Sequence, residues 1–136
     1  MSDASHALQQ AVYDALAQSL PLQNLIGNPP RIYDHHKQEP IFPYVVIGEA
    51  RLSDYPGLAG GLEHDLRVHA FSLYGGQREA KEFHGLIREA LHDQALMLAG
   101  HRLVNLRFVF GDILRLRDGE SWQAVLRFRA VTQPLA

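Results

Sequence analysis

Two runs of alternating apolar and polar residues, joined by a turn, constrain the fold of this chain more than any other feature. Together they span His101 to Thr132. Alternation with a period of two places every second side chain on the same face of a strand. Between the runs lies the sequence RDGE at 117–120, and Asp-Gly suits a hairpin turn in which the backbone adopts positive φ. The segment therefore predicts a β-hairpin with one buried face.

The parity of this hairpin assigns its residues to two faces. The face expected in the core carries Val104, Leu106, Phe108, Phe110, Trp122, Ala124, Leu126, Phe128 and Ala130. The opposite face mixes valine with fixed cations, at Arg107, Val109, Val125, Arg127 and Arg129. Arginine is enriched in protein–protein interfaces, and this face is more apolar than a solvated one. We therefore expect these five residues to contact a neighbouring subunit or another protein.

Two segments have helical periodicity. The first, residues 2–20, has apolar residues spaced by four, at Leu8, Val12, Leu16 and Leu20. Pro21 interrupts it, and one or two further turns are expected before Gly27. The second, residues 77–93, has one continuous apolar stripe opposite a charged face. Gly85 lies inside this helix at a cost of about 1 kcal/mol relative to alanine, which close packing against the sheet or a neighbour would offset.

The remaining segments predict strands and loops. Residues 44–52 and 62–74 are rich in β-branched and aromatic residues, and residues 31–34 predict a shorter strand. The segment 62–74 is longer than the mean strand of about 5–6 residues, so a bend or bulge is expected there. The whole chain, 1–136, predicts a single α+β domain. It should have a mainly antiparallel sheet of about four strands, with two helices packed on one face.

Composition excludes several classes of function. The chain has 136 residues, a formal net charge of −2 and no cysteine. It therefore has no general affinity for nucleic acid, no disulfide, and no thiol chemistry or cysteine-ligated metal. No apolar run approaches the ~20 residues that span a bilayer. The start, MSDASHALQQ, lacks the features of a signal peptide. We expect a cytoplasmic protein, or part of an assembly made there, without a membrane partner.

Histidine is frequent, with 8 residues, but its spacing does not predict a site. Adjacent residues of an extended chain point to opposite sides, which separates His35 from His36, and His64 and His69 have opposite parity on one strand. Neither HExxH nor GxSxG occurs. No catalytic, cofactor-binding or metal-binding residue is therefore predicted. A small metal-dependent hydrolase using Asp34, His35 and His36 is kept as an alternative function.

The charged residues of the strands have a second interpretation. Glu49, Glu63 and Asp65 could form a general acid–base pair, but nearby arginines favour a charge-paired sheet face. The same arginines could contact nucleic acid. However, the hairpin aromatics take the core parity, which disfavours a base-stacking platform. A peptide- or nucleic-acid-binding module is the other alternative function.

Five segments carry a resemblance to a known family: RIYDH (31–35), FPYVVIGE (42–49), HDLRVHAFSLYGGQREAKEFHGLIREALHD (64–93), LAGHRLVNLRF (98–108) and AVLRFRAVT (124–132). In their order and spacing they resemble the tail-completion, or tail-terminator, proteins of long-tailed bacteriophages and gene transfer agents. The resemblance covers nearly the whole chain. It implies a small α+β structural protein, without catalytic residues or cofactors.

The resemblance also implies partners and a location. Members of this family form a homohexameric ring that caps the tail tube protein, ends its polymerisation and joins the tail to the head–tail connector protein. DNA passes through the ring without sequence-specific binding. Such a protein lies in the bacterial cytoplasm during assembly and then at the head–tail junction. Rings need heterologous contacts between copies. We therefore expect the arginine face of the hairpin to contact an acidic or apolar patch on the neighbouring subunit. We expect loops 35–43 and 53–61 to dock axial neighbours.

Overall fold

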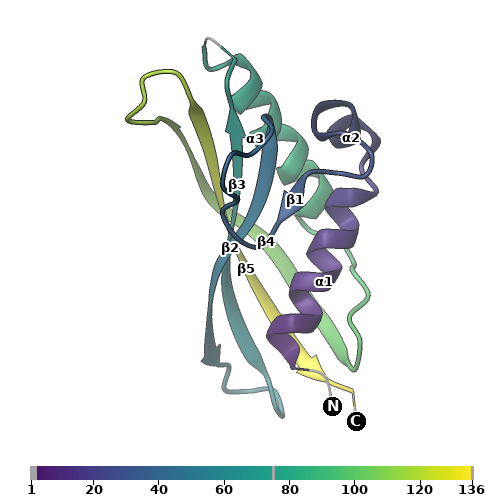
Figure 1. The fold of residues 1–136 in the computed structure, drawn as a ribbon. Coiled ribbons are helices and arrows are strands. Elements are labelled where there is room, and N and C mark those ends of the chain that lie inside the picture. The colour runs from purple at the N-terminus through teal and green to yellow at the C-terminus, as the bar shows by residue number, and fades with distance from the viewer. Residues whose placement is uncertain (1–2, 75, 136) are drawn as a thin grey trace.

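Five strands form one mixed sheet in the computed structural model, which describes residues 3–74 and 76–135. The strands are β1 Ile32–Tyr33, β2 Tyr44–Asp54, β3 Leu62–Ser72, β4 His101–Arg115 and β5 Trp122–Pro134. Their order across the sheet is β1-β2-β3-β5-β4 (Figure 1). β1 pairs parallel with β2, and the other three pairings are antiparallel. The β4–β5 hairpin predicted from the sequence is confirmed.

Three helices cover one face of this sheet (Figure 1): α1 Ala4–Ala17, α2 Leu20–Ile26 and α3 Arg78–Leu91. The predicted α+β class is confirmed, but its details differ by one strand and one helix within the described residues. The extra helix is α2, which begins separately because the Ser19 hydroxyl accepts a hydrogen bond from the Leu22 amide. Proline near its start also suits the first turn of a helix. Ser2, the predicted first residue of α1, lies outside the described residues.

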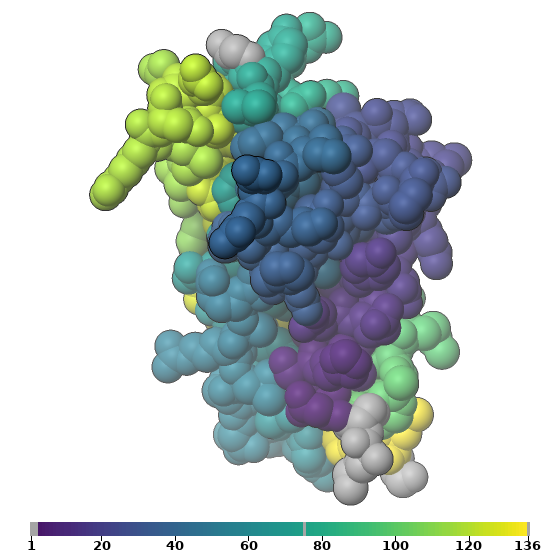
Figure 2. Space-filling view, in the orientation of Figure 1, coloured from purple at the N-terminus to yellow at the C-terminus, as the bar shows by residue number. Residues whose placement is uncertain are grey.

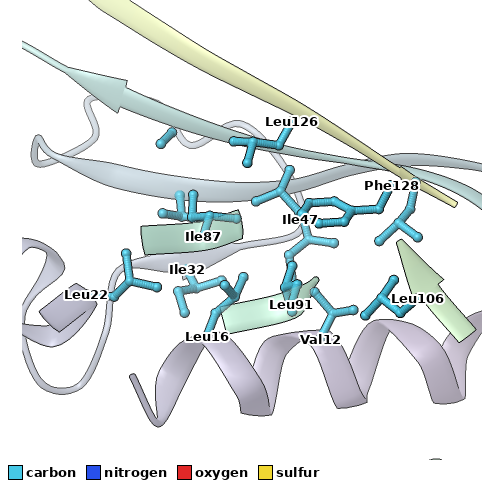
Figure 3. Close-up of a cluster of buried hydrophobic side chains, with 14 of the residues drawn as sticks. Val12, Leu16, Leu22, Ile32, Ile47, Ile87, Leu91, Leu106, Leu126 and Phe128 are labelled. Carbon is cyan, nitrogen blue, oxygen red and sulfur yellow. The ribbon is translucent and has the colours of Figure 1, made fainter. Parts of the chain in front are cut away.

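The core lies between the helices and the sheet (Figure 3). Each helix contributes fully buried aliphatic residues, including Leu16 of α1, Leu22 of α2 and Ile87 of α3. They pack against alternate residues of β5, namely Ala124, Leu126, Phe128 and Ala130. Full burial of one such large side chain stabilises the fold by about 1.5–3 kcal/mol. The predicted core face of β5 is confirmed.

The predicted core face of β4 is correct only in its middle. Two register shifts against β5, at 103–105 and 108–110, each place one extra residue in β4. A bulge reverses the alternation of side chains beyond it. Leu106 is therefore buried as predicted, whereas Val104 and Phe110 are 37% and 42% exposed. The prediction that these two residues lie in the core is wrong, because the alternation alone does not show where an extra residue interrupts it.

The bulge expected in the strand at 62–74 lies in a neighbouring strand instead. β3 pairs with β5 without interruption from Leu62 to Ser72. The irregularity is in β2, between Ile47 and Ala50. A Cβ at Gly48, inside this bulge, would lie 2.6 Å from the His69 ring. Glycine therefore leaves the space that the His69 side chain occupies on β3.

Candidate interaction surface

The five residues predicted to contact a neighbour lie on the outer face, defined as the face of the sheet turned away from the helices. Arg107, Val109 and Arg129 are exposed, and Val125 and Arg127 are half-buried. Val109, Arg127 and Arg129 line one shallow hollow of about 380 Å³ together with residues of β2 and β3. Arg107 and Val125 are not among its lining residues. The structure thus brings three of the five together, and whether they form an interface stays a prediction.

Carboxylates of β3 pair with the arginines of β5 across this hollow. Arg127 binds Asp65 with two hydrogen bonds, of which Nε to Oδ1 is 2.8 Å. This hydrogen bonding holds the pKa of the Asp65 carboxyl below its usual value, against the opposing effect of its burial. Arg129 Nε lies 3.4 Å from Glu63 Oε2. Both cations therefore have an acidic partner within their own subunit, as the charge-paired interpretation of this face predicts.

Further charge pairs extend this pattern. Arg67 lies 3.8 Å from Glu49, and Arg107 lies 3.9 Å from Asp93. Phe110, which the bulge turns to the outer face, lies beneath the Arg127 guanidinium at 5.6 Å. The sequence argument missed Phe110 at this surface. The available signal was Gly111, because an isolated glycine within a strand often marks a bulge or a close approach of the backbone.

Loop 34–43 covers the other end of the outer face. Phe42 packs on Tyr44, which stacks on Phe71 at 4.8 Å, and both Tyr44 and Phe71 are buried. The ring of His36 meets Phe71 edge-on at 5.7 Å. The loop forms part of the blue surface in the upper middle of Figure 2. These aromatic rings are therefore covered, which disfavours base stacking at this end of the outer face.

The residues of the alternative hydrolase do not converge. His35 Nδ1 lies 2.8 Å from Asp34 Oδ1, and both residues line a groove beside α1. His36 instead packs on Phe71, on the other side of the chain. No cluster of three or more His, Asp or Glu residues with metal-binding geometry occurs in the part of the chain that the structure describes. The sequence-based separation of His35 from His36 is confirmed.

The second histidine pair is also divided between two faces. His64 is buried on the helix side, where Nε2 lies 2.8 Å from the Thr132 hydroxyl. His69 lies on the outer face, 2.8 Å from the Gln123 amide nitrogen. Their predicted opposite parity is confirmed. In the described residues, no helix has the length and apolar character to cross a membrane.

The described residues form an α+β domain whose outer sheet face carries paired arginines and carboxylates. Comparison with known families identifies the class. The family described as tail completion protein gp17 matches residues 10–133. The chain belongs to this family, which confirms the resemblance found in its sequence. It is a structural, non-enzymatic tail-completion protein.

Solved structures with the same fold agree with this assignment. A chain from the virion of a native gene transfer agent particle is 28% identical, with a TM-score of 0.85. The match covers 97% of this chain and 98% of that chain. A second solved protein is 13% identical, with a TM-score of 0.61 over 94% of this chain and 97% of its own, and it shows the fold alone. No curated protein matches significantly.

Proposed function

We propose that this chain is a tail-terminator subunit whose six copies form a ring on the end of a tail tube. The ring ends polymerisation of the tube protein and joins the tail to the head–tail connector, and DNA passes through its hole. One observation carries the proposal: the chain matches a component of a gene transfer agent virion over 97% of its length. The subunit would assemble in the bacterial cytoplasm and remain at the head–tail junction.

The charges of the molecule suit a passage for DNA. Each phosphate that a protein neutralises adds affinity for the duplex. On the outer face, Arg127 and Arg129 are paired with carboxylates, and the formal net charge of the chain is −2. A mildly acidic chain in which these arginines are paired has little net positive charge to hold phosphate, which suits a ring through which DNA slides.

Contacts within the proposed ring involve the hairpin. Arg107 and Val109 are exposed on β4, the last strand of the sheet, where a neighbouring copy can reach them. Val125, Arg127 and Arg129 lie one strand further in, on β5. We propose these five residues as the surface that meets the neighbour. Loops 35–43 and 53–61 then remain for the axial partners, the tube and the connector.

Light scattering with the purified subunit and its tube protein tests this function. The subunit should form a ring of six, alone or on the tube end, and should shorten tubes when added during polymerisation. Binding of DNA should be weak at physiological salt. A subunit that stays monomeric under both conditions and leaves tube length unchanged would rule the function out.

A further inference from the structure

β4 presents an open edge on one side of the sheet. Its partner is β5, and it is the last strand in the order. Val109, Phe110 and Leu114 of this strand are 48%, 42% and 44% exposed. Long edge strands with exposed apolar residues tend to pair with strands of other chains. This edge is therefore a candidate for contact with a neighbour.

The residues that follow α3 cover the middle of the β4 edge, and the part of β4 nearer the hairpin tip lies beyond them. The Asp93 amide donates to the Leu106 carbonyl at 2.8 Å, and the Phe108 amide donates to His92 Nδ1 at 3.0 Å. The end of α3 thus occupies the edge at Leu106 and Phe108. Residues 110–115 continue past this cap toward the hairpin tip, which projects beyond the helices at the upper left of Figure 1.

β2 presents a second open edge at the other side of the sheet. β1 pairs with it only at Val45 and Val46 among the described residues. Residues 49–54, which lie beyond β1, are all exposed although β3 pairs with residues 50–54 on the other side. This open segment is close in length to the segment 110–115 of β4, and both match the usual strand of about 5–6 residues.

The two edges have the relative direction that a ring needs. β2, β3, β5 and β4 are joined by three antiparallel pairings, so β2 and β4 run in opposite directions. If copies follow one another around an axis, the β4 edge of one copy therefore meets the β2 edge of the next in antiparallel sense. Because the two edges differ, the contact is heterologous and can close into a ring.

The faces and charges of the two segments select one register. Residues opposite each other in an antiparallel pair lie on the same face. Arg51 of β2 lies on the outer face, opposite Asp65, and Asp112 of β4 lies on that face, opposite Val125. Neither Arg51 nor Asp112 forms a salt bridge within the described residues. Placing them opposite each other joins two complementary charges.

This register staggers neighbouring copies by an amount that suits a closed sheet. Within one subunit, Arg51 is level with Arg129, because both pair with Asp65. Asp112 is level with Val125, four residues from Arg129 along β5. At about 3.3 Å per residue and about 4.8 Å between strands, this shift across four strands tilts them by about 35°. Strands in closed barrels are tilted by about 35–45°.

We infer that β2 of one subunit pairs antiparallel with β4 of the next copy, with Arg51 opposite Asp112, so that the sheet continues from subunit to subunit. This inference rests on the proposed ring and names the strands that close it. Asp54 at the end of the neighbour's β2 then lies opposite Val109, which links this edge contact to the proposed hairpin surface.

Engineered cysteines test the contact directly, because the chain has no cysteine of its own. Opposed residues of antiparallel strands have Cα atoms about 4.5–5.5 Å apart, within the range of a disulfide. Rings of an Arg51→Cys, Asp112→Cys double variant should oxidise to covalent multimers up to the full ring on a non-reducing gel. The matched control, Arg51→Cys with Glu82→Cys on the exposed side of α3, should not. Rings that form normally without the first cross-link would overturn the inference and leave the proposed function intact.

Charge reversal gives a second readout. Arg51→Asp or Asp112→Arg alone places like charges together and should raise the concentration needed for half-assembly by at least about tenfold. The double reversal should restore assembly. If it fails to restore rings while each variant remains folded, the register is wrong. If the unmodified chain forms no ring with its tube protein, the proposed function fails and the inference fails with it.

Discussion

His64 is a buried polar residue with only one of its ring nitrogens paired. Its Nε2 bonds the Thr132 hydroxyl, and its Nδ1 has no hydrogen-bond partner among the described residues. Burial lowers the pKa of His64, an effect that Asp3 opposes and His101 reinforces. The lowered pKa favours the neutral side chain at pH 7, and adding a proton to it in the folded protein costs stability.

The first prediction is that His64 makes the fold sensitive to mild acid. The unfolded chain takes up this proton near pH ~6.5, above the lowered pKa of the folded state. The free energy of unfolding should therefore fall as the pH drops below that value, by at most about 1.4 kcal/mol per pH unit for one proton. Urea denaturation between pH 7 and 5 should show a shallower fall for His64→Gln, which cannot titrate.

The unmodified protein, denatured in the same buffers, is the reference for this slope. Burial also lowers the pKa values of His69 and His84. The slope of His64→Gln should therefore decrease without vanishing. Equal slopes in His64→Gln and the unmodified protein would contradict this explanation of His64.

The second prediction concerns His92, whose side chain accepts a hydrogen bond from one backbone amide, that of Phe108. Its Nδ1 accepts from the Phe108 amide on the edge of β4, while Nε2 lies 3.2 Å from Asp93. His92→Leu removes this acceptor. A part-buried amide without a partner costs about 1–3 kcal/mol. Hydrogen exchange by NMR should show faster exchange of the Phe108 amide, and the Leu126 amide inside the sheet should be the slow reference. An unchanged exchange rate of the Phe108 amide would contradict this role of His92.

At the scale of single residues, the sequence predicts faces well wherever strands are regular. The parity that separates His64 from His69 and buries Leu126 follows from uninterrupted pairing of β3 with β5. It fails at Val104 and Phe110, because each follows or forms part of a bulge in β4. The bulges depend on how β4 fits its partner, and the alternation within one strand does not contain that information.

At the scale of elements, α3 and β4 approach closely at Gly111. A Cβ there would lie 2.1 Å from His84 Nε2 and 3.0 Å from the Val125 carbonyl oxygen. The same His84 ring packs edge-on against Phe108 at 5.4 Å, and the Arg88 guanidinium lies over Phe108 at 4.9 Å. The absence of a side chain at Gly111 therefore permits the packing that joins the helix to the edge strand.

The third prediction compares Gly111, at this contact, with Gly85, which is exposed on α3. Gly111→Ala should lower the free energy of unfolding by about 1–3 kcal/mol, because a methyl group is forced into a filled space. Gly85→Ala in α3 should raise it by up to about 1 kcal/mol, since alanine favours a helix. A Cβ at Gly85 has no neighbour within 4 Å among the described residues. The expectation that packing against the sheet offsets the cost of Gly85 is therefore wrong, and packing against a neighbour stays a prediction. Urea denaturation of both variants checks the opposite signs, and a destabilised Gly85→Ala would contradict the comparison.

The features that the sequence did not specify are those defined by strand partners. β1 lies inside the short strand predicted at 31–34, but its parallel pairing with Val45 and Val46 has no signal in a two-residue strand. The long helices and strands were predicted because each has a repeating apolar face. The hollow on the outer face was only partly predictable. Its arginines were visible in the pattern, but the diagonal pairing of Arg127 with Asp65 depends on the register of two strands that are distant in the sequence.

At the scale of the whole molecule, function depends on surfaces that the subunit does not use for its own fold. Arg107 is a candidate for contact with another copy, because its side chain is exposed and its ion pair with Asp93 is long, at 3.9 Å. Arg127 is less suitable for a test by substitution, since it binds Asp65 with two hydrogen bonds and its replacement would disturb the sheet. In the proposed ring, Arg107 lies near the β2–β3 hairpin of the next copy, which carries Asp54.

The fourth prediction separates the internal role of Arg107 from its proposed external one. Arg107→Glu should prevent ring formation and tube capping while the subunit remains folded, because it sets a negative charge against the acidic end of the neighbouring β2. Asp93→Asn removes the same internal ion pair but leaves the cation, and asparagine suits the positive φ of 55° at this position. Light scattering should therefore show normal rings for Asp93→Asn and monomers for Arg107→Glu, with matching circular dichroism. If both variants lose the ring, the internal pair is what matters, and Arg107 supports the cap at the edge of β4 rather than the contact between copies.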